Sequence, residues 1–242
     1  MNPYLANKRA RAVIISYKAD ERLINLIESL GIEIIFTQKA KVDPRIDDHA
    51  DIQVHPVSYD KFIVAPRLFD YYKEKLQVYG IEVIKGSTFL EEKYPKDCPY
   101  NLARLNNFYI SKKGVADRLL EKILEDQGLK AIYQKQAYAK CSTIGFEDFA
   151  ITCDKSILKA LRDRDIEAYY INNENIKLEG FNIGFLGGSC GIIDNKKILF
   201  TGDISLLKDF NILKKILHEK EIEIIFPKDA SLTDIGSIIP II

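Results

Sequence analysis

The sequence predicts an α/β fold in which five β-β-α-β repeats close into a ring, a five-bladed propeller with pseudo-fivefold symmetry. Three observations predict it. A short strand-like phrase recurs five times, an amphipathic helical segment precedes each copy, and the chain ends in an apolar segment with no helix behind it. Repetition at intervals of tens of residues is typical of rings and solenoids.

The recurring phrase has an Ile or Leu as its second residue and then alternates branched with charged or small residues, which is typical of a strand. Its copies occupy residues 31–36, 80–85, 128–133, 165–170 and 221–226. The segments before them have apolar residues at three- and four-residue steps, such as Leu120 and Leu124, and are therefore predicted helices. Gly31, Gly80 and Gly128 suit left-handed caps at the helix ends.

Two further strands are expected in front of most helices. The strands next to the helices are predicted at residues 11–17, 61–66, 108–111, 149–153 and 197–201. Leading strands are predicted at 51–55, 101–105, 139–143 and 181–185. The first repeat lacks a leading strand, and the apolar segment 234–240 is expected to supply it by pairing beside residues 12–17, so that the two termini close the ring.

The alternative fold is an open doubly wound α/β sheet. That fold does not require paired strands before each helix or a C-terminal strand without a helix, and no Gly-x-Gly-x-x-Gly follows the first strand. No change of composition divides the chain, so a single domain spanning residues 1–242 is expected.

Composition excludes several classes of protein. Thirty-five Lys and Arg residues balance 35 Asp and Glu residues, so nucleic-acid and membrane-surface partners are not expected. No apolar run reaches the roughly 18 residues of a membrane span, and the N-terminus lacks a signal-peptide core, which predicts a cytoplasmic protein. Four cysteines lie far apart without a Cys-x-x-Cys pair, which disfavours a zinc knuckle or a disulfide framework.

A ring of five β-β-α-β repeats closed by the termini resembles the pentein superfamily, the α/β propellers that modify guanidino groups. These include arginine deiminases, dimethylarginine dimethylaminohydrolases and amidinotransferases, and the ribosome anti-association initiation factor shares the fold without catalysis. More local phrases resemble a bacterial family of unknown function; they lie at residues 49–56, 94–97 with Asn101, 138–142, 184–191 and 234–240.

The resemblance implies an acidic residue on a leading strand that binds a guanidinium, a His as general base and a Cys nucleophile near the C-terminus. Asp51 matches the acidic residue by its place in the repeat. The other two roles do not transfer. Residues 231–242 contain no Cys, and the only late His, His218, lies in a predicted helix that should face outward.

Polar residues on the leading strands should share one site around the axis of such a ring. Asp51, Asn101, Arg104, Lys140, Ser189 and Asp234 are the predicted ligand-binding residues, and His49, His55, Cys141 and Cys190 lie on the same segments. The alternative interpretation is a polar core in which each group is satisfied by a neighbour.

Cys141 and His49 are the predicted catalytic pair. Lys140 precedes Cys141, its cation would favour the thiolate, and a His from the first repeat would act as the base; the alternative is an inert buried thiol. No metal or other cofactor is expected, because His49, Asp51 and His55 would spread over about 20 Å along a strand. The glycine-rich segment 184–191 lacks the Lys-Ser/Thr of a phosphate-binding loop and predicts a tight turn with close backbone approach at Gly187 and Gly188.

The function predicted from the sequence is binding of a small polar ligand, a guanidino or amino-acid compound, in an axial pocket. Any catalysis would be hydrolysis or group transfer at a C–N bond of a guanidino-type substrate. The alternative is a non-catalytic protein-interaction module of the initiation-factor type.

Overall fold

The computed structural model describes residues 2–242 of the chain. They form an α/β fold of five three-stranded sheets, with strand orders β15-β1-β2, β3-β4-β5, β6-β7-β8, β9-β10-β11 and β12-β13-β14. In each sheet the middle strand pairs antiparallel with one neighbour and parallel with the other. The alternative of one open doubly wound sheet is wrong, because the described strands fall into five short sheets rather than one.

The middle and parallel strands lie where the sequence predicts them. The middle strands are β1 (Ala12–Ile15), β4 (Lys61–Val64), β7 (Phe108–Lys112), β10 (Phe149–Thr152) and β13 (Lys197–Phe200). The parallel strands, each within a copy of the recurring phrase or ending one residue beyond it, are β2 (Glu33–Phe36), β5 (Glu82–Lys85), β8 (Lys130–Gln134), β11 (Glu167–Tyr170) and β14 (Glu223–Ile225).

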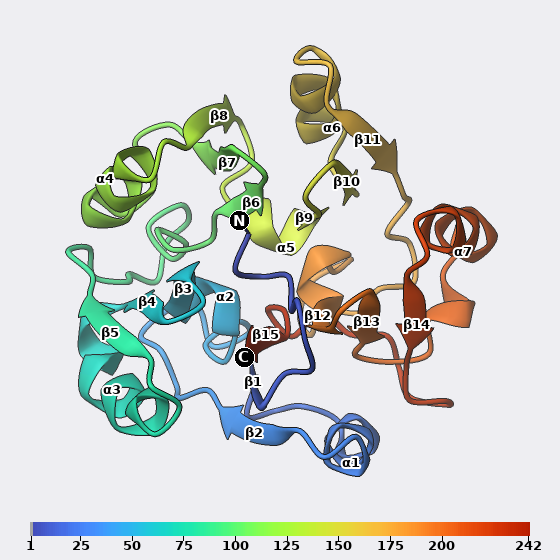
Figure 1. Ribbon diagram of the computed structural model, residues 1–242, viewed down its shortest axis with the longest axis horizontal. Coiled ribbons are helices and arrows are strands. Elements are labelled where there is room, and N and C mark those ends of the chain that lie inside the picture. The colour runs from blue at the N-terminus through green and yellow to red at the C-terminus, as the bar shows by residue number, and fades with distance from the viewer. Residues whose placement is uncertain (1) are drawn as a thin grey trace.

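A helix links each parallel pair and lies on the outside of the molecule (Figure 1). These helices are α1 (Glu21–Ser29), α3 (Phe69–Gln77), α4 (Arg118–Asp126), α6 (Lys155–Arg162) and α7 (Phe210–Glu219), with the 3-10 turns η1 (Pro66–Leu68) and η3 (Ile204–Leu206) before α3 and α7. Asp20, Asp117 and Asp154 cap three of them by accepting backbone N–H groups.

Each of the five helices is followed within a few residues by a residue with a left-handed backbone conformation. The glycine caps predicted from the sequence are confirmed at Gly31, Gly80 and Gly128, which have φ of 65°, 79° and 82°. Asp165 and Glu221, with φ of 57° and 58°, take the same place after α6 and α7. The turn from helix to parallel strand is therefore made the same way five times, with or without glycine.

The two termini pair as predicted. Strand β15 (Ile239–Ile241) lies antiparallel to β1, with Ala12 opposite Ile241 and Ile14 opposite Ile239. Ile239 and Ile241 are almost fully buried. Only the end of the predicted segment 234–240 is strand, because residues 234–238 form a turn with left-handed backbone at Gly236 and Ser237.

The leading strands are shorter than predicted or begin later, and this is a correction. They are β3 (Val54–Ser58), β6 (Ala103–Leu105), β9 (Thr143–Gly145) and β12 (Cys190–Asp194). The residues just before three of them form single helical turns, α2 (Ala50–Gln53), α5 (Ala139–Ser142) and η2 (Gly187–Ser189). Residues 181–185 contain no strand. A helical turn of this length is too short to show a period in the sequence.

The apolar core lies between the sheets and their outer helices, in four clusters of buried side chains. One such cluster joins Val13 and Ile15 of β1 to Leu23 and Ile27 of α1. The five sheets are arranged around the middle of the molecule, where α2, α5 and β15 meet (Figure 1). The beginnings of the leading strands, and the turns before them, therefore face the middle.

Candidate functional site

The candidate site is a buried cluster of polar side chains that come from the turns before the leading strands. Asp51 lies in α2, Cys141 and Lys140 lie in α5, and Asn101 lies just before β6. The turn before β15 contributes Ser237. Each of these residues is at most 7% exposed, so the cluster is closed to bulk solvent in this structure.

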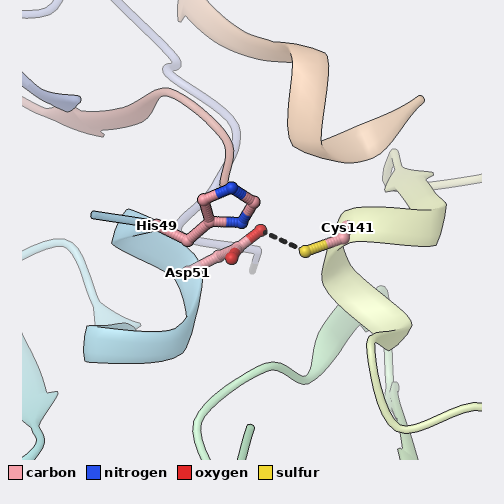
Figure 2. A group of neighbouring side chains, drawn as sticks. All are labelled: His49, Asp51 and Cys141. Atoms are coloured by element: carbon pink, nitrogen blue, oxygen red, sulfur yellow. Dashed lines mark hydrogen bonds between the residues drawn. The ribbon is translucent and has the colours of Figure 1, made fainter. Parts of the chain in front are cut away.

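Asp51 and Cys141 are in direct contact (Figure 2). The Cys141 thiol donates to Oδ2 of Asp51 at 3.0 Å, and Nδ2 of Asn101 donates to Sγ of Cys141 at 3.1 Å. Oδ1 of Asn101 accepts the backbone N–H groups of Lys140 and Cys141 at 2.9 and 3.3 Å. One asparagine therefore holds both the turn of α5 and the sulfur that the turn presents.

Ser237 connects Asp51 to Lys140. The Lys140 ammonium donates to Oγ of Ser237 at 2.9 Å and to the Gly187 carbonyl oxygen at 3.3 Å. The Ser237 hydroxyl lies 2.7 Å from Oδ2 of Asp51 and donates to it. The charge of Lys140 is thus directed toward Ser237 and η2, and not toward the sulfur that follows it in the sequence.

His49 and Asp234 form the other side of the cluster. The His49 imidazole points toward Asp51 and Cys141 (Figure 2), and its Nδ1 lies 3.9 Å from Oδ1 of Asp234. The Asp234 carboxylate accepts the backbone N–H groups of Phe185 and Gly236 at 2.9 and 3.0 Å. Burial raises the pKa of Asp234, and the neighbouring His49 opposes that rise.

Glycines make the close packing around the cluster possible. A Cβ atom at Gly187 would lie 2.4 Å from the Lys140 carbonyl oxygen, and one at Gly188 would lie 2.0 Å from Oδ1 of Asp234. The close backbone approach predicted for both positions is therefore confirmed. The same holds at Gly236, where φ is 72° and a Cβ atom would lie 2.3 Å from that of His49.

A second buried group, formed by Tyr4, His55 and Arg104, lies beside the cluster. The Tyr4 hydroxyl and the Tyr100 carbonyl oxygen each lie 3.1 Å from Nδ1 of His55. The Lys140 ammonium lies over the Tyr4 ring, 5.2 Å from its centroid. Burial lowers the pKa of His55 to about 3 and that of Arg104 to about 10. His55 is therefore a neutral hydrogen-bonding group near neutral pH.

The N-terminal segment crosses the middle of the molecule (Figure 1). Asn2 fixes it there, because its side-chain amide donates to the carbonyl oxygens of Arg104 and Gly145, both at 3.0 Å. Tyr4 follows and is 5% exposed. The segment therefore packs beside the polar cluster, with the Tyr4 ring against the Lys140 ammonium.

The Cys141 thiol is protonated in this arrangement. Burial raises its pKa well above the ordinary value, and the neighbouring negative charge of Asp51 raises it further. The thiol is accordingly the donor in its hydrogen bond with Asp51. The catalytic roles of Cys141 and His49 stay predictions.

A buried carboxylate oxygen of the cluster has no hydrogen-bond partner in the part of the chain that the structure describes. Oδ1 of Asp51 is buried and accepts no hydrogen bond among the described residues, whereas Oδ2 of the same carboxylate accepts two. Leaving a buried acceptor unpaired costs about 1–3 kcal/mol. The arrangement thus offers one free carboxylate oxygen to a cation or a donor group in the middle of the molecule.

The structure brings together most of the residues predicted for the site. His49, Asp51, Asn101, Lys140, Cys141 and Asp234 lie in or against the cluster, and Arg104 and His55 lie beside it. Ser189 is buried, but its hydroxyl donates to the Leu186 carbonyl oxygen of its own turn. Cys190, whose sulfur contacts the same carbonyl oxygen, also stays with that turn. His218 is exposed on α7, as predicted.

Ser237 and Tyr4 are the residues that the sequence did not indicate. Ser237 follows Gly236 in an Asp-Ile-Gly-Ser turn, and this Gly-Ser pair before the last apolar residues is the signal that could have found it. Tyr4 had no such signal, because its role depends on where the N-terminal segment crosses the molecule.

The sequence matches a family model over residues 14–239, that of a family of unknown function, DUF6873. The chain belongs to this family. No curated protein sequence matches it significantly. No helix in the described part of the chain is long and apolar enough to cross a membrane.

Solved structures show which fold the family has. The chain is similar to DDAH from Pseudomonas aeruginosa, in a complex with citrulline, with 13% identity, a TM-score of 0.57, and coverage of 91% of this chain and 92% of that one. An amidinotransferase from Microseira wollei matches with 12% identity, a TM-score of 0.56, and coverage of 94% and 91%. C. jejuni agmatine deiminase matches with 12% identity, a TM-score of 0.56, and coverage of 96% and 93%. This DUF6873 protein therefore has a pentein fold, as the repeats predict.

Proposed function

We propose that the polar cluster of this DUF6873 protein binds a small cationic ligand of the guanidino or amidino class. The single observation that supports it most directly is the unpaired, buried Oδ1 of Asp51. A guanidinium presents planar N–H donors that match carboxylate oxygens, and its bonds to a buried carboxylate are charge-assisted. Asp51 would be the anionic group that pairs with the ligand.

The neighbours of Asp51 support a cationic ligand more than an anionic one. Asp234 places a second carboxylate near the cluster, on the far side of His49. The only lysine of the cluster, Lys140, is already bonded to Ser237 and Gly187. An added cation would be attracted by two buried carboxylates, whereas an added anion would be repelled by both.

The fold comparison agrees with this ligand class. C. jejuni agmatine deiminase is named for a guanidino cation, and the citrulline bound to DDAH carries the corresponding uncharged ureido group. The proposal for this chain is limited to binding, because the buried Cys141 thiol is protonated and the Lys140 ammonium is directed elsewhere. Entry of a ligand also requires the cluster to open, because its side chains are buried.

We also propose three further features of the protein. The five sheets would be the blades of one closed ring, a five-bladed propeller, which the pairing of β1 with β15 supports. Residues 1–242 would form a single domain. The protein would reside in the cytoplasm, which the absence of a disulfide among its four cysteines supports.

Calorimetric titration of the full chain with agmatine and L-arginine tests the proposal, with citrulline as the uncharged counterpart. We expect one of the two cations to bind, and Asp51→Asn to weaken its binding about 10- to 100-fold, since a hydrogen bond to a charged group contributes about 1.5–3 kcal/mol. Asp47→Asn is the matched control, because Asp47 is also buried but is paired with Lys18 outside the cluster. Failure of every cation to bind, or equal binding by the Asp51 variant, would overturn the proposal and favour the interaction module.

A further inference from the structure

Three side chains of the cluster have the donor atoms and the spacing of a metal site. One ligand atom each of His49, Asp51 and Cys141 lies within 4.8 Å of the other two, and all three residues are buried. The imidazole, the carboxylate and the sulfur point toward one another (Figure 2). A tetrahedral ion with bonds of about 2.0–2.3 Å separates its ligand atoms by less than that spacing, so only small side-chain shifts are needed.

The backbone holds these ligands in place before any ion arrives. The Asp51 N–H donates to the Gly236 carbonyl oxygen at 3.0 Å, and His49 precedes α2 with its side chain packed against Gly236. The Cys141 N–H donates to Oδ1 of Asn101 at 3.3 Å. Two helical turns from opposite sides of the middle are therefore fixed so that their side chains meet.

Two further observations point to a ligand at this place. Oδ1 of Asp51 is buried without a hydrogen-bond partner. The His49 imidazole lies 3.9 Å from the Asp234 carboxylate, which is itself fixed by two backbone N–H groups. Histidine ligands commonly have such a carboxylate beside them, and it orients the ring.

We propose that His49, Asp51 and Cys141 bind a divalent transition-metal ion of the Zn²⁺ type. One sulfur, one nitrogen and one oxygen donor suit Zn²⁺ and not Mg²⁺ or Ca²⁺, which take oxygen donors. The Cys141 thiol loses its proton to solvent as the sulfur–metal bond forms, and the hydrogen bond from that thiol to Asp51 is lost. The two negative ligands then neutralise the two positive charges of the ion inside the buried cluster.

The metal site and the proposed guanidinium site share Asp51 but otherwise depend on different side chains. An ion at Asp51 would occupy the oxygen that the proposed guanidinium needs, so the two should compete. Cys141 and His49 are needed only for the metal. Substitution of these two residues therefore separates the two proposals, whereas Asp51→Asn should weaken both metal binding and guanidinium binding.

Titration of the purified full chain with Co²⁺ tests the metal site, because a Co²⁺–thiolate bond gives a charge-transfer band in the near ultraviolet. We expect the wild-type protein to show this band and Zn²⁺ to remove it by displacement. Cys141→Ser should abolish the band, and Cys153→Ser, which alters a half-buried cysteine that is not one of the proposed ligands, should keep it. Circular dichroism of each variant establishes that it is folded.

Binding strength gives a second measurement that does not depend on the sulfur. We expect His49→Gln to weaken Zn²⁺ binding more than Asp234→Asn, which should weaken it about 10- to 100-fold by removing the carboxylate beside the imidazole. Absence of a Co²⁺ band in the wild-type protein, persistence of the band in Cys141→Ser, or unchanged Zn²⁺ affinity in folded His49→Gln would overturn the proposal. None of these results would bear on the proposal of guanidinium binding, because that proposal does not need Cys141 or His49.

Discussion

The outer layer of this molecule is repetitive, whereas its middle is not. In the outer layer the same unit occurs five times: a helix, a left-handed residue and a parallel strand that begins with similar residues. In the middle, the five turns before the leading strands do not follow one pattern: two are four-residue α-helical turns, one is a 3-10 turn and two are not helical. They are α2, the segment before β6, α5, η2 and the turn at residues 234–238.

This difference separates what determines the fold from what determines the site. The pattern of each outer unit, a helix followed by a left-handed residue and a parallel strand, occurs in four other places along the chain. The fold is therefore indicated by the sequence more than once. Each polar contact of the middle, in contrast, depends on one side chain, such as the hydroxyl of Ser237 between Asp51 and Lys140. We therefore expect single substitutions in the polar cluster to change binding and titration, and loss of a whole strand of a sheet to change folding.

The largest effect is expected from removal of β15. Deletion of residues 239–242 takes away a strand of the first sheet and two nearly fully buried isoleucines, Ile239 and Ile241. Burial of each contributes about 1.5–3 kcal/mol, and β1 would also become an unpaired sheet edge. We expect the truncated chain to be unfolded or aggregated in circular dichroism and thermal melts.

Ser237→Ala is the matched change in the middle. It leaves β15 intact and removes one hydroxyl of the polar cluster, which should cost about 1–3 kcal/mol of the free energy of unfolding. The variant should therefore melt at a lower temperature but in one cooperative transition. A truncated chain that melts like the full chain would contradict the pairing of the termini as a requirement for folding.

The same contrast explains how much the sequence predicts. Middle and parallel strands, helices and their caps were predicted because each pattern is local and occurs five times. The left-handed residues after α6 and α7 are Asp165 and Glu221, which give no glycine signal, yet the neighbouring repeats indicate their place.

The sequence predicts which side chains lie near the middle of the molecule but not how they are arranged there. The sequence places Asp51 and Cys141 near the middle, but it predicts strands where α2 and α5 lie, because four residues are too few to show a helical period. That error placed His49, Asp51 and His55 along a strand and argued against a shared metal. Ser237 contacts a residue 186 positions away, and no local pattern encodes such a contact.

A smaller effect on stability is expected from acidification, and it comes from His55 in the middle of the molecule. His55 has a folded-state pKa of about 3 against an ordinary value of 6.5, so below pH 6.5 the unfolded chain binds a proton that the folded chain does not. Its contribution to stability is present above pH 6.5 and is lost as the pH falls toward 3. From pH 6.5 to about pH 5 the free energy of unfolding should fall by about 2 kcal/mol.

Urea unfolding of wild type and His55→Gln at several pH values measures this contribution. Glutamine keeps a donor for the Tyr100 carbonyl oxygen but does not titrate. The variant should therefore lose less stability on acidification than the wild type, and the difference between the two isolates His55 from carboxyl groups such as Asp234. Parallel curves for the two proteins would contradict a neutral, buried His55.

The smallest expected effect is on thiol labelling, and it compares a cysteine of the middle with one nearer the surface. Iodoacetamide reacts with the thiolate, and burial raises the pKa of Cys153 to about 12. The pKa of Cys141 is also raised well above the ordinary value, by fuller burial and by Asp51. Cys153 is also partly exposed, whereas Cys141 is 1% exposed. Peptide mass spectrometry of the native protein near neutral pH should therefore find Cys153 labelled before Cys141.

The catalytic hypothesis predicts the reverse order. If Lys140 and His49 activated Cys141 as a nucleophile, Cys141 would label first, and His49→Ala would slow it by removing the base. His218→Ala would have no effect in either case, because His218 lies exposed on α7. Slow labelling of Cys141 that is unchanged in His49→Ala would remove it as a nucleophile of the free protein. It would leave the thiol available as a metal ligand, since a bound ion displaces the proton that burial and Asp51 hold on the sulfur.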